Sequence, residues 1–291
     1  MKLQKIVNRL QKLHPKEIDL SLDRIKFLCK KLGNPQDEIN CIQVCGTNGK
    51  GSTISFLRSI LKEANIKCNI YTSPHVVRIN ERFVYNDEMI SDDDLSNLLN
   101  EIEEINNGQP LTYFEALTAA FFHGCKKYKQ NLVIAEFGLF GRGDAVNILK
   151  KNLCNIVTSC SEDHLDWLPK NDRTIERIIF EKTSSLLNSN IVVAKQNSNE
   201  IIGYIKKNIS NNSANKYYFK ENYNFVLKEN DFFYYEDKYG SLKIPKPNLN
   251  GQFQIENAST AIATLRILEN IKINDQHIIN GIKKAYNIAR L

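Results

Sequence analysis

The sequence lacks the cysteine patterns that build disulfide frameworks or zinc sites. Its seven cysteines include no C-x-x-C pair, and most of them lie within apolar runs. We therefore expect buried thiols in a protein of the reducing cytosol. Cys160 and His164 are near neighbours, but no further ligands follow them at the spacings that zinc sites use. These residues argue against a zinc site.

Long apolar runs are missing as well. No stretch approaches the roughly 20 residues that cross a membrane, and the Lys-rich residues 1–13 lack the apolar centre of a signal peptide. The net charge is +6, but the lysines are scattered and form no basic stripe with stacking aromatics. We expect a cytoplasmic protein, a monomer, that binds small molecules and neither nucleic acid nor a membrane.

The clearest motif is a glycine-rich turn between an apolar run at 42–45 and an amphipathic helix. Glycines let backbone N–H groups close around a phosphate, and the start of the helix adds its positive dipole end. A lysine reaches the terminal phosphates, and a serine hydroxyl can bind Mg²⁺. The turn comprises Gly46, Thr47, Asn48, Gly49, Lys50, Gly51 and Ser52. It predicts a nucleoside triphosphate site, although it is two residues shorter than the common G-x-x-x-x-G-K-[ST].

Short apolar runs alternate with helical patterns along most of the chain. The runs at 69–73, 132–135, 154–158 and 191–194 predict strands of a mostly parallel sheet with helices on both faces. Helices are predicted at 2–13, 21–32, 92–105, 112–128, 256–271 and 276–287, with Ser91 as an N-cap. The aromatic runs between about 216 and 247 predict a small antiparallel sheet attached to the main one. With 291 residues, the chain fits one large α/β unit.

Ligands of parallel sheets bind beyond the carboxyl ends of the strands. Ser73, Glu136 and His164 all follow predicted strands, so we expect them beside the glycine-rich turn. Hydroxyl, carboxylate and phosphate oxygens suit Mg²⁺, and a histidine suits a second ion site. Taken singly, Glu136 is equally well explained by capping a helix or by pairing with Arg142, and His164 as a loop histidine. Beside the glycine-rich turn, we favour the metal-site interpretation. Lys182, on a predicted helix, is typical of a solvated charge.

Several motifs together resemble the folylpolyglutamate synthase and dihydrofolate synthase group of the Mur ligase superfamily. They occur in the family's order across nearly the whole chain. They are Gly46–Ser52, Tyr71–His75 with Glu81-Arg82, Glu136–Ala145, Asp163–Asp166, Glu181-Lys182, Gly251–Gln254 with Asn257-Ala258, and Ala289–Leu291. The shortened turn has the form expected in that superfamily. The loop at 140–147 departs from the family pattern, with a phenylalanine at 140 and a glycine at 143.

The resemblance implies an ATP-dependent ligase that adds L-glutamate to dihydropteroate, to reduced folate or to both, through an acyl phosphate. By similarity, Ser52, Ser73, Glu136 and His164 hold Mg²⁺, and Lys50, Glu136, His164 and Lys182 serve catalysis. Lys182 matches a lysine that this family carbamylates. Gln254, Asn257 and Arg290 match nucleotide positions. Phe114, Asp144 and Ala145 match the pterin pocket.

The resemblance also predicts the domain organisation. Residues 1–291 correspond to the family's ATP-binding domain, with N-terminal helices over 1–40, the small sheet at about 216–247 and the start of a linker at 288–291. We expect the family's second, glutamate-ligase domain to be absent from this chain. A nucleotide-binding module without ligase activity and another Mur-type amide ligase therefore stay open. The roughly forty residues before the turn are too few for a UDP-sugar-binding domain, and no guanine signature indicates a GTPase.

Overall fold

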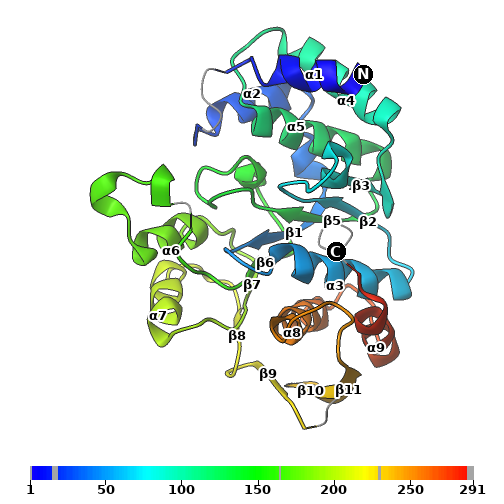
Figure 1. Ribbon diagram of the computed structural model, residues 1–291, viewed down its shortest axis with the longest axis vertical. Helices are drawn as coiled ribbons and strands as arrows, with labels where there is room; N and C mark the ends of the chain where they lie inside the picture. Colours follow the sequence, from blue (N-terminus) through cyan, green and yellow to red (C-terminus); the bar gives the residue numbers. More distant parts are fainter. Residues whose placement is uncertain (1, 15–18, 164, 229–230, 287–291) are drawn as a thin grey trace.

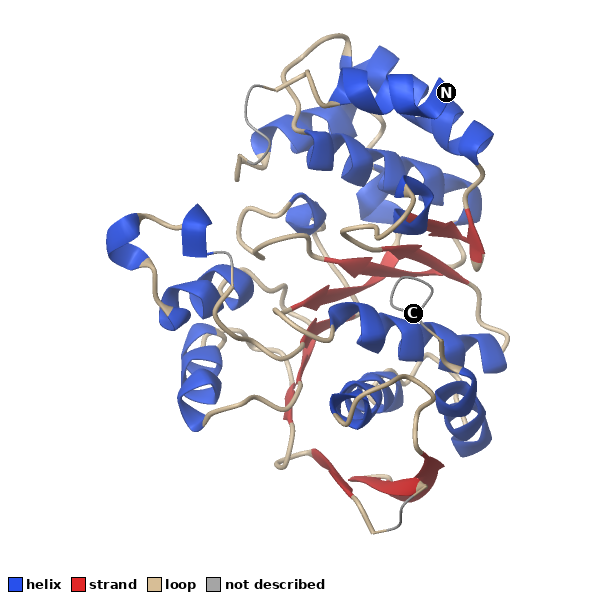
Figure 2. Cartoon of the chain, in the orientation of Figure 1, coloured by secondary structure: helices blue, strands red, loops and turns tan. Residues whose placement is uncertain are grey.

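The computed structural model describes residues 2–14, 19–163, 165–228 and 231–286. An eight-stranded sheet crosses the molecule, in the order β4-β3-β2-β5-β1-β6-β7-β8 (Figures 1 and 2). The strands from β2 to β8 in that order run parallel, and β3 and β4 form an antiparallel hairpin at one edge. The strands are β1 (Asn40–Cys45), β2 (Cys68–Tyr71), β3 (Phe83–Tyr85), β4 (Glu88–Met89), β5 (Leu132–Glu136), β6 (Cys154–Val157), β7 (Asn190–Val193) and β8 (Lys216–Tyr218).

Helices cover both faces of this sheet (Figure 2). On one face lie α1 (Lys2–Leu10), α2 (Asp23–Lys31), α4 (Asp92–Asn106), α5 (Tyr113–Cys125), α6 (Ile175–Thr183) and α7 (Asn199–Asn208). On the other lie α3 (Lys50–Glu63), α8 (Phe253–Arg266) and α9 (Asp275–Lys284). Short 3-10 helices lie at Pro35–Glu38, Ile79–Arg82, Lys126–Tyr128, Ala145–Ile148, Leu165–Trp167 and Lys170–Asp172. The predicted α/β class, with a mostly parallel sheet covered on both sides, is confirmed.

The two-residue period of a strand explains why β1 serves two separate cores. Cys41 and Cys45 pack into the core below α5, whereas Ile42 and Val44 pack into the core below α3. β1 lies between β5 and β6 and is buried on both faces, which is why it reads as an apolar run. The described cysteines are all buried free thiols, as expected from their positions.

The small antiparallel sheet contains β9 (Tyr223–Val226), β10 (Phe232–Asp237) and β11 (Gly240–Pro245). The prediction was wrong for the first aromatic run, because Lys216–Tyr218 joins the main sheet as β8, parallel to β7. Tyr218 is buried against the main core. Pairing of β8 with β7, which is distant in sequence, is therefore favoured over pairing with the nearby strands of the small sheet. Aromatic composition indicates a strand but does not select the strand that it pairs with.

Local capping determines where several helices begin. The Ser91 hydroxyl accepts from the Asp94 amide at 3.1 Å, which confirms the predicted N-cap of α4. Thr112 and Glu115 form a capping box at the start of α5. The helices predicted at 2–13 and 276–287 are shorter, since α1 ends at Leu10 and α9 at Lys284. In the described part of the chain, every helix is too short or too polar to span a bilayer.

Candidate active site

The glycine-rich turn joins the end of β1 to the start of α3, as the sequence predicts. Gly46 and Gly49 have φ angles of 130° and 87°, which L side chains rarely adopt. A Cβ atom on Gly46 would lie 2.1 Å from Thr158 Oγ1, and one on Gly49 would lie 2.4 Å from Asn257 Oδ1. These two positions therefore require glycine for both conformation and space.

Two lysines meet at one backbone carbonyl of the turn. Lys50 Nζ donates to the carbonyl oxygens of Gly46 and Thr47 at 3.1 and 3.2 Å. Lys182 Nζ donates to the same Gly46 oxygen at 3.2 Å and to that of Leu139 at 2.9 Å. The prediction of a solvated Lys182 was wrong, because its side chain is among the largest that are fully buried. Burial, and next the charge of Lys50, lowers the pKa of Lys182.

Ser73 and Glu136 lie together beside this turn, as expected from strand ends at one sheet edge. The Ser73 amide donates to Glu136 Oε2 at 3.0 Å, and Lys50 Nζ lies 3.9 Å from Glu136 Oε1. Glu136 is only 6% exposed. The proposed pairing of Glu136 with Arg142 does not occur, since Arg142 binds the Glu181 carboxylate in a bidentate manner at 2.9 and 3.0 Å. His164 lies outside the described residues.

The oxygen atoms at this edge fit a hard divalent cation. The Ser73 hydroxyl is buried and has no hydrogen-bond partner among the described residues, a condition that normally costs stability. It lies next to a buried carboxylate and near the first turn of α3, where Ser52 is also buried. Hydroxyl and carboxylate oxygens with nearby phosphates are the ligands that Mg²⁺ prefers. Among the described residues, no group of three or more His, Cys, Asp or Glu side chains forms a complete metal site by itself.

A groove of about 600 Å³ opens from this edge and follows the outer side of α3. Gly51, Ser73 and Glu136 lie at one end of its lining. Its walls come from α3, the β2 end, β3 and β4 and the segment after α9. The groove thus leaves room for an elongated ligand whose end reaches the predicted phosphate and metal positions.

The predicted nucleotide residues of α8 also reach the turn. Asn257 stands against Gly49, and its amide donates to Gln254 Oε1 at 3.1 Å. Both side chains are largely buried. The structure therefore brings Gln254 and Asn257 to the same loop that carries Lys50. Arg290 lies outside the described residues.

The residues predicted for a pterin pocket lie around the loop that follows β5. The Phe114 ring is packed against Gly138, where an added Cβ would lie 2.6 Å from the ring. Asp144 Oδ2 accepts from the Gly138 and Leu139 amides at 2.8 and 3.0 Å, and Oδ1 accepts from the Val146 amide at 2.9 Å. Asp144 and Ala145 are both buried. Asp144 thus holds its own loop and keeps little acceptor capacity for another molecule.

Burial also changes the protonation of Asp144. It raises the pKa of this carboxyl to about 6, although the three backbone donors act in the opposite direction. The charged form is therefore costly at this position and depends on the loop amides for its stability.

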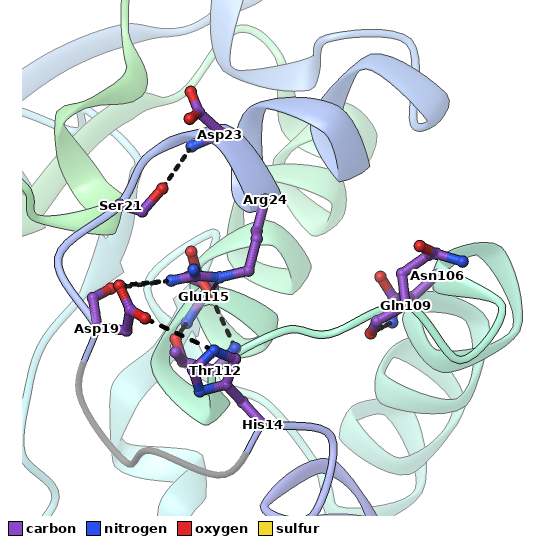
Figure 3. A network of polar contacts seen from close by, with 9 residues as sticks. All are labelled: His14, Asp19, Ser21, Asp23, Arg24, Asn106, Gln109, Thr112 and Glu115. Atoms are coloured by element: carbon purple, nitrogen blue, oxygen red, sulfur yellow. Dashed lines mark hydrogen bonds and ion pairs between the residues drawn. The ribbon is translucent and has the colours of Figure 1, made fainter.

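Sequence reasoning did not identify a polar network that supports the start of α5, next to Phe114. Figure 3 shows Arg24 between Asp19 and Glu115. Arg24 Nε donates to Glu115 Oε2 at 3.0 Å, and the same oxygen accepts from the Thr112 amide at 2.8 Å. Glu115 is 3% exposed, so it needs these partners. The T-x-x-E capping pattern at 112–115 was the available signal, whereas Arg24 is ninety-one positions away in sequence.

A second unpredicted contact lies after the *cis* Ser73-Pro74 bond. Arg82 Nε donates to His75 Nδ1 at 2.8 Å, and this acceptor role requires an unprotonated Nδ1. Burial, followed by the charge of Arg82, lowers the pKa of His75. Glu81 accepts from the amides of Val76, Val77 and Arg78 and closes the same loop. This loop borders the groove near Ser73.

The chain is similar to a known family and to curated relatives. The model of the Mur ligase middle domain matches residues 44–265. The dihydrofolate synthase/folylpolyglutamate synthase of *Bacillus subtilis* (strain 168) is 32% identical over 288 residues. That match covers 93% of this chain and 65% of the relative, so the chain spans about two thirds of that protein's length.

Solved structures of enzymes from the same group are also similar to this chain. *E. coli* FolC in complex with DHPP and ADP has a TM-score of 0.86 and 32% identity, covering 97% of this chain and 66% of that one. The bifunctional folylpolyglutamate synthase/dihydrofolate synthase of *Yersinia pestis*, complexed with AMPPNP and a Mn ion, has a TM-score of 0.85 and 29% identity. The match covers 98% of this chain and 66% of the Yersinia pestis chain.

Proposed function

The chain belongs to the Mur ligase middle-domain family, and we propose that it provides the ATP-binding and phosphoryl-transfer site of a folate-type glutamate ligase. The reaction adds L-glutamate to dihydropteroate, to a reduced folate or to both. The observation that carries the proposal is the meeting of Lys50, Glu136 and Ser73 at the start of α3, where the buried Ser73 hydroxyl has no partner within the described part of the chain. This arrangement provides positive charge, a helix N-terminus and hard oxygen ligands within one small volume.

The proposed reaction has two steps. A carboxylate oxygen of the acceptor attacks the γ-phosphorus of ATP, so that a P–O bond forms and ADP leaves. The amine of L-glutamate then attacks the acyl carbon, an amide bond forms, and inorganic phosphate leaves with the electron pair of the broken C–O bond. Phosphoryl transfer of this kind depends mainly on positioning and on neutralising negative charge. Lys50 and the amides of the first turn of α3 are suited to both tasks.

Ser73 and Glu136 are proposed to hold Mg²⁺, together with Ser52 and with His164, which lies outside the described residues. The bound ion supplies neutralisation of phosphate charge. Glu136 accepts from the Ser73 amide, which fixes the carboxylate beside the buried Ser73 hydroxyl. The lowered pKa of Lys182 favours the neutral amine that carbamylation requires, and this supports a modified Lys182 as part of the proposal.

We assign the pterin end of the acceptor to the surroundings of Phe114, where the ring can stack on a flat heterocycle. Asp144 and Ala145 would shape that pocket, with Asp144 acting mainly by holding the loop. The groove along α3 is proposed to admit the part of the acceptor that carries the reacting carboxylate.

The test is incubation of the chain with Mg-ATP, L-glutamate and either dihydropteroate or a reduced folate, followed by mass spectrometry. A product heavier by one glutamyl unit, with one ADP released per product, supports the ligase. Nucleotide binding or ATP turnover without that product would support a nucleotide-binding module instead. Failure to bind Mg-ATP would overturn both. The Lys50→Met variant serves as the control for nucleotide-dependent signal.

A further inference from the structure

The segment after β6 runs beside the first half of the glycine-rich turn and bonds to it repeatedly. The Ser159 carbonyl oxygen accepts from the amides of Thr47 and Asn48 at 2.9 and 3.0 Å. The Thr47 hydroxyl donates to the Ser161 carbonyl at 3.1 Å and accepts from the Ser161 amide at 3.2 Å. The Asn48 side-chain amide donates to Ser161 Oγ at 3.2 Å. We call these four residues, Thr47, Asn48, Ser159 and Ser161, the brace.

The brace is itself held by the neighbouring strand. The Cys160 amide donates to Gln196 Oε1 at 2.8 Å, just beyond the end of β7. The Gln196 side-chain amide donates in turn to the carbonyl oxygens of Thr158 and Ala194, at 3.1 and 3.0 Å. The turn is therefore fixed against two strand ends besides its own, rather than held by α3 alone.

These bonds divide the turn into two halves. An amide that donates to Ser159 points away from any phosphate, so Thr47 and Asn48 have their backbone donors already in use. The amides of residues 49–52 lie at the N-terminus of α3, where no earlier carbonyl of the helix can accept them. The donors suited to a phosphate are therefore those of the second half.

We propose that Thr47 is a positioning residue that aims the second half of the turn, and that it does not itself bind phosphate. This rests on the proposed function, because it concerns the same nucleotide site. The Thr47 hydroxyl both donates to and accepts from Ser161, so it fixes the direction of the chain just before Gly49 turns with φ 87°. A loop held in its binding conformation loses less entropy when the ligand binds.

The first experiment compares binding of Mg-AMPPNP to the wild-type chain, Thr47→Val and Thr47→Ser by titration calorimetry. Valine keeps the shape of threonine and removes both hydroxyl bonds, so we expect the dissociation constant to rise about tenfold. Serine keeps the hydroxyl and should restore binding to within about twofold. The matched control is Thr264→Val in α8, where the lost hydroxyl donates to the Thr260 carbonyl and has no other partner among the described residues. Wild-type affinity in Thr47→Val, or equal loss in Thr47→Ser, would overturn the proposal.

The second experiment begins without nucleotide, and this first part separates the inference from the proposed function. Amide hydrogen exchange should show Thr47 and Asn48 protected and residues 49–51 exchanging quickly. Thr47→Val should lose that protection while its melting temperature stays equal to that of Thr264→Val. Adding Mg-AMPPNP should protect residues 49–52 and leave Thr47 and Asn48 unchanged. If the wild type binds no nucleotide, the proposed function fails, but fast exchange of Thr47 and Asn48 in the free protein is what would reject the brace.

Discussion

Two glycine-rich loops follow neighbouring strands at one edge of the sheet, and they use their backbone amides in opposite ways. In the turn after β1, the amides of residues 49–52 begin a helix, so no earlier helix carbonyl accepts them, and Gly51 lines the groove. In the loop after β5, the Gly138 and Leu139 amides bind Asp144, and the Gly141 and Arg142 amides bind the Glu181 carbonyl. Glycine content alone therefore does not distinguish an anion site from a closed turn. The distinction depends on which acceptors the rest of the fold brings to the amides.

The largest effect is expected from removing the cation of the first loop. Lys50→Met should weaken Mg-AMPPNP binding by about 100-fold or more, because the largely buried positive charge proposed to lie next to the phosphates is lost. Lys151→Met, at an exposed position just before β6 and outside the groove lining, should bind like the wild type. Calorimetry measures both variants. Binding of Lys50→Met within about threefold of the wild type would show that the loop is no phosphate site.

A substitution in the loop after β5 should change the stability of the protein. Gly141→Ala places a Cβ atom 2.5 Å from the Lys182 carbonyl oxygen, and this neighbour is backbone that cannot move aside easily. We expect the free energy of unfolding in urea to fall by about 1–3 kcal/mol. In Gly203→Ala, within α7, the new Cβ meets no atom within 4 Å, and stability should rise by about 0.5–1 kcal/mol. Equal stability of the two variants would contradict the tight packing of this loop.

The contribution of the loop after β5 to the free energy of unfolding should also depend on pH. The pKa of Asp144 is raised from 3.8 to about 6, so between these values the folded protein binds more protons than the unfolded chain. The stability that Asp144 contributes is therefore fully present below its unfolded pKa and is lost as the pH rises through about 6, by about 1 kcal/mol per pH unit. Urea unfolding of the wild type and Asp144→Asn, from pH 4.5 to 7, measures this difference. A wild-type advantage that grows with rising pH would contradict the sign.

The smallest effect on nucleotide affinity is expected from adding a single methyl group to the turn after β1. An added Cβ on Gly51 meets no protein atom within 4 Å, and its φ is not positive. Gly51→Ala should therefore unfold like the wild type but bind Mg-AMPPNP about three- to tenfold more weakly, because the methyl group occupies space beside the phosphate. A large loss of stability would mean that this half of the turn is packed like the loop after β5.

Features that depend on neighbouring residues were predictable from the sequence. The turn at 46–52, the N-cap Ser91 and the capping box at 112–115 combine residue types at fixed short spacings. The meeting of Ser73 and Glu136 was also predictable, since parallel strands bring their carboxyl ends to one edge. The pairing of β8, the burial of Lys182 and the bonds of Thr47 with Ser161 involve partners far apart in the chain. No local pattern encodes those partners.

By itself, the sequence determined the class of fold, the position of the glycine-rich turn and the sheet edge where Ser73 and Glu136 meet, because these follow from local spacing and strand direction. Only the tertiary structure decided which amides of each glycine-rich loop remain available, since the acceptors for the others come from distant strands and helices. The availability of an amide matters because an N–H group that already donates to Ser159, Asp144 or Glu181 cannot also donate a full-strength hydrogen bond to a phosphate oxygen.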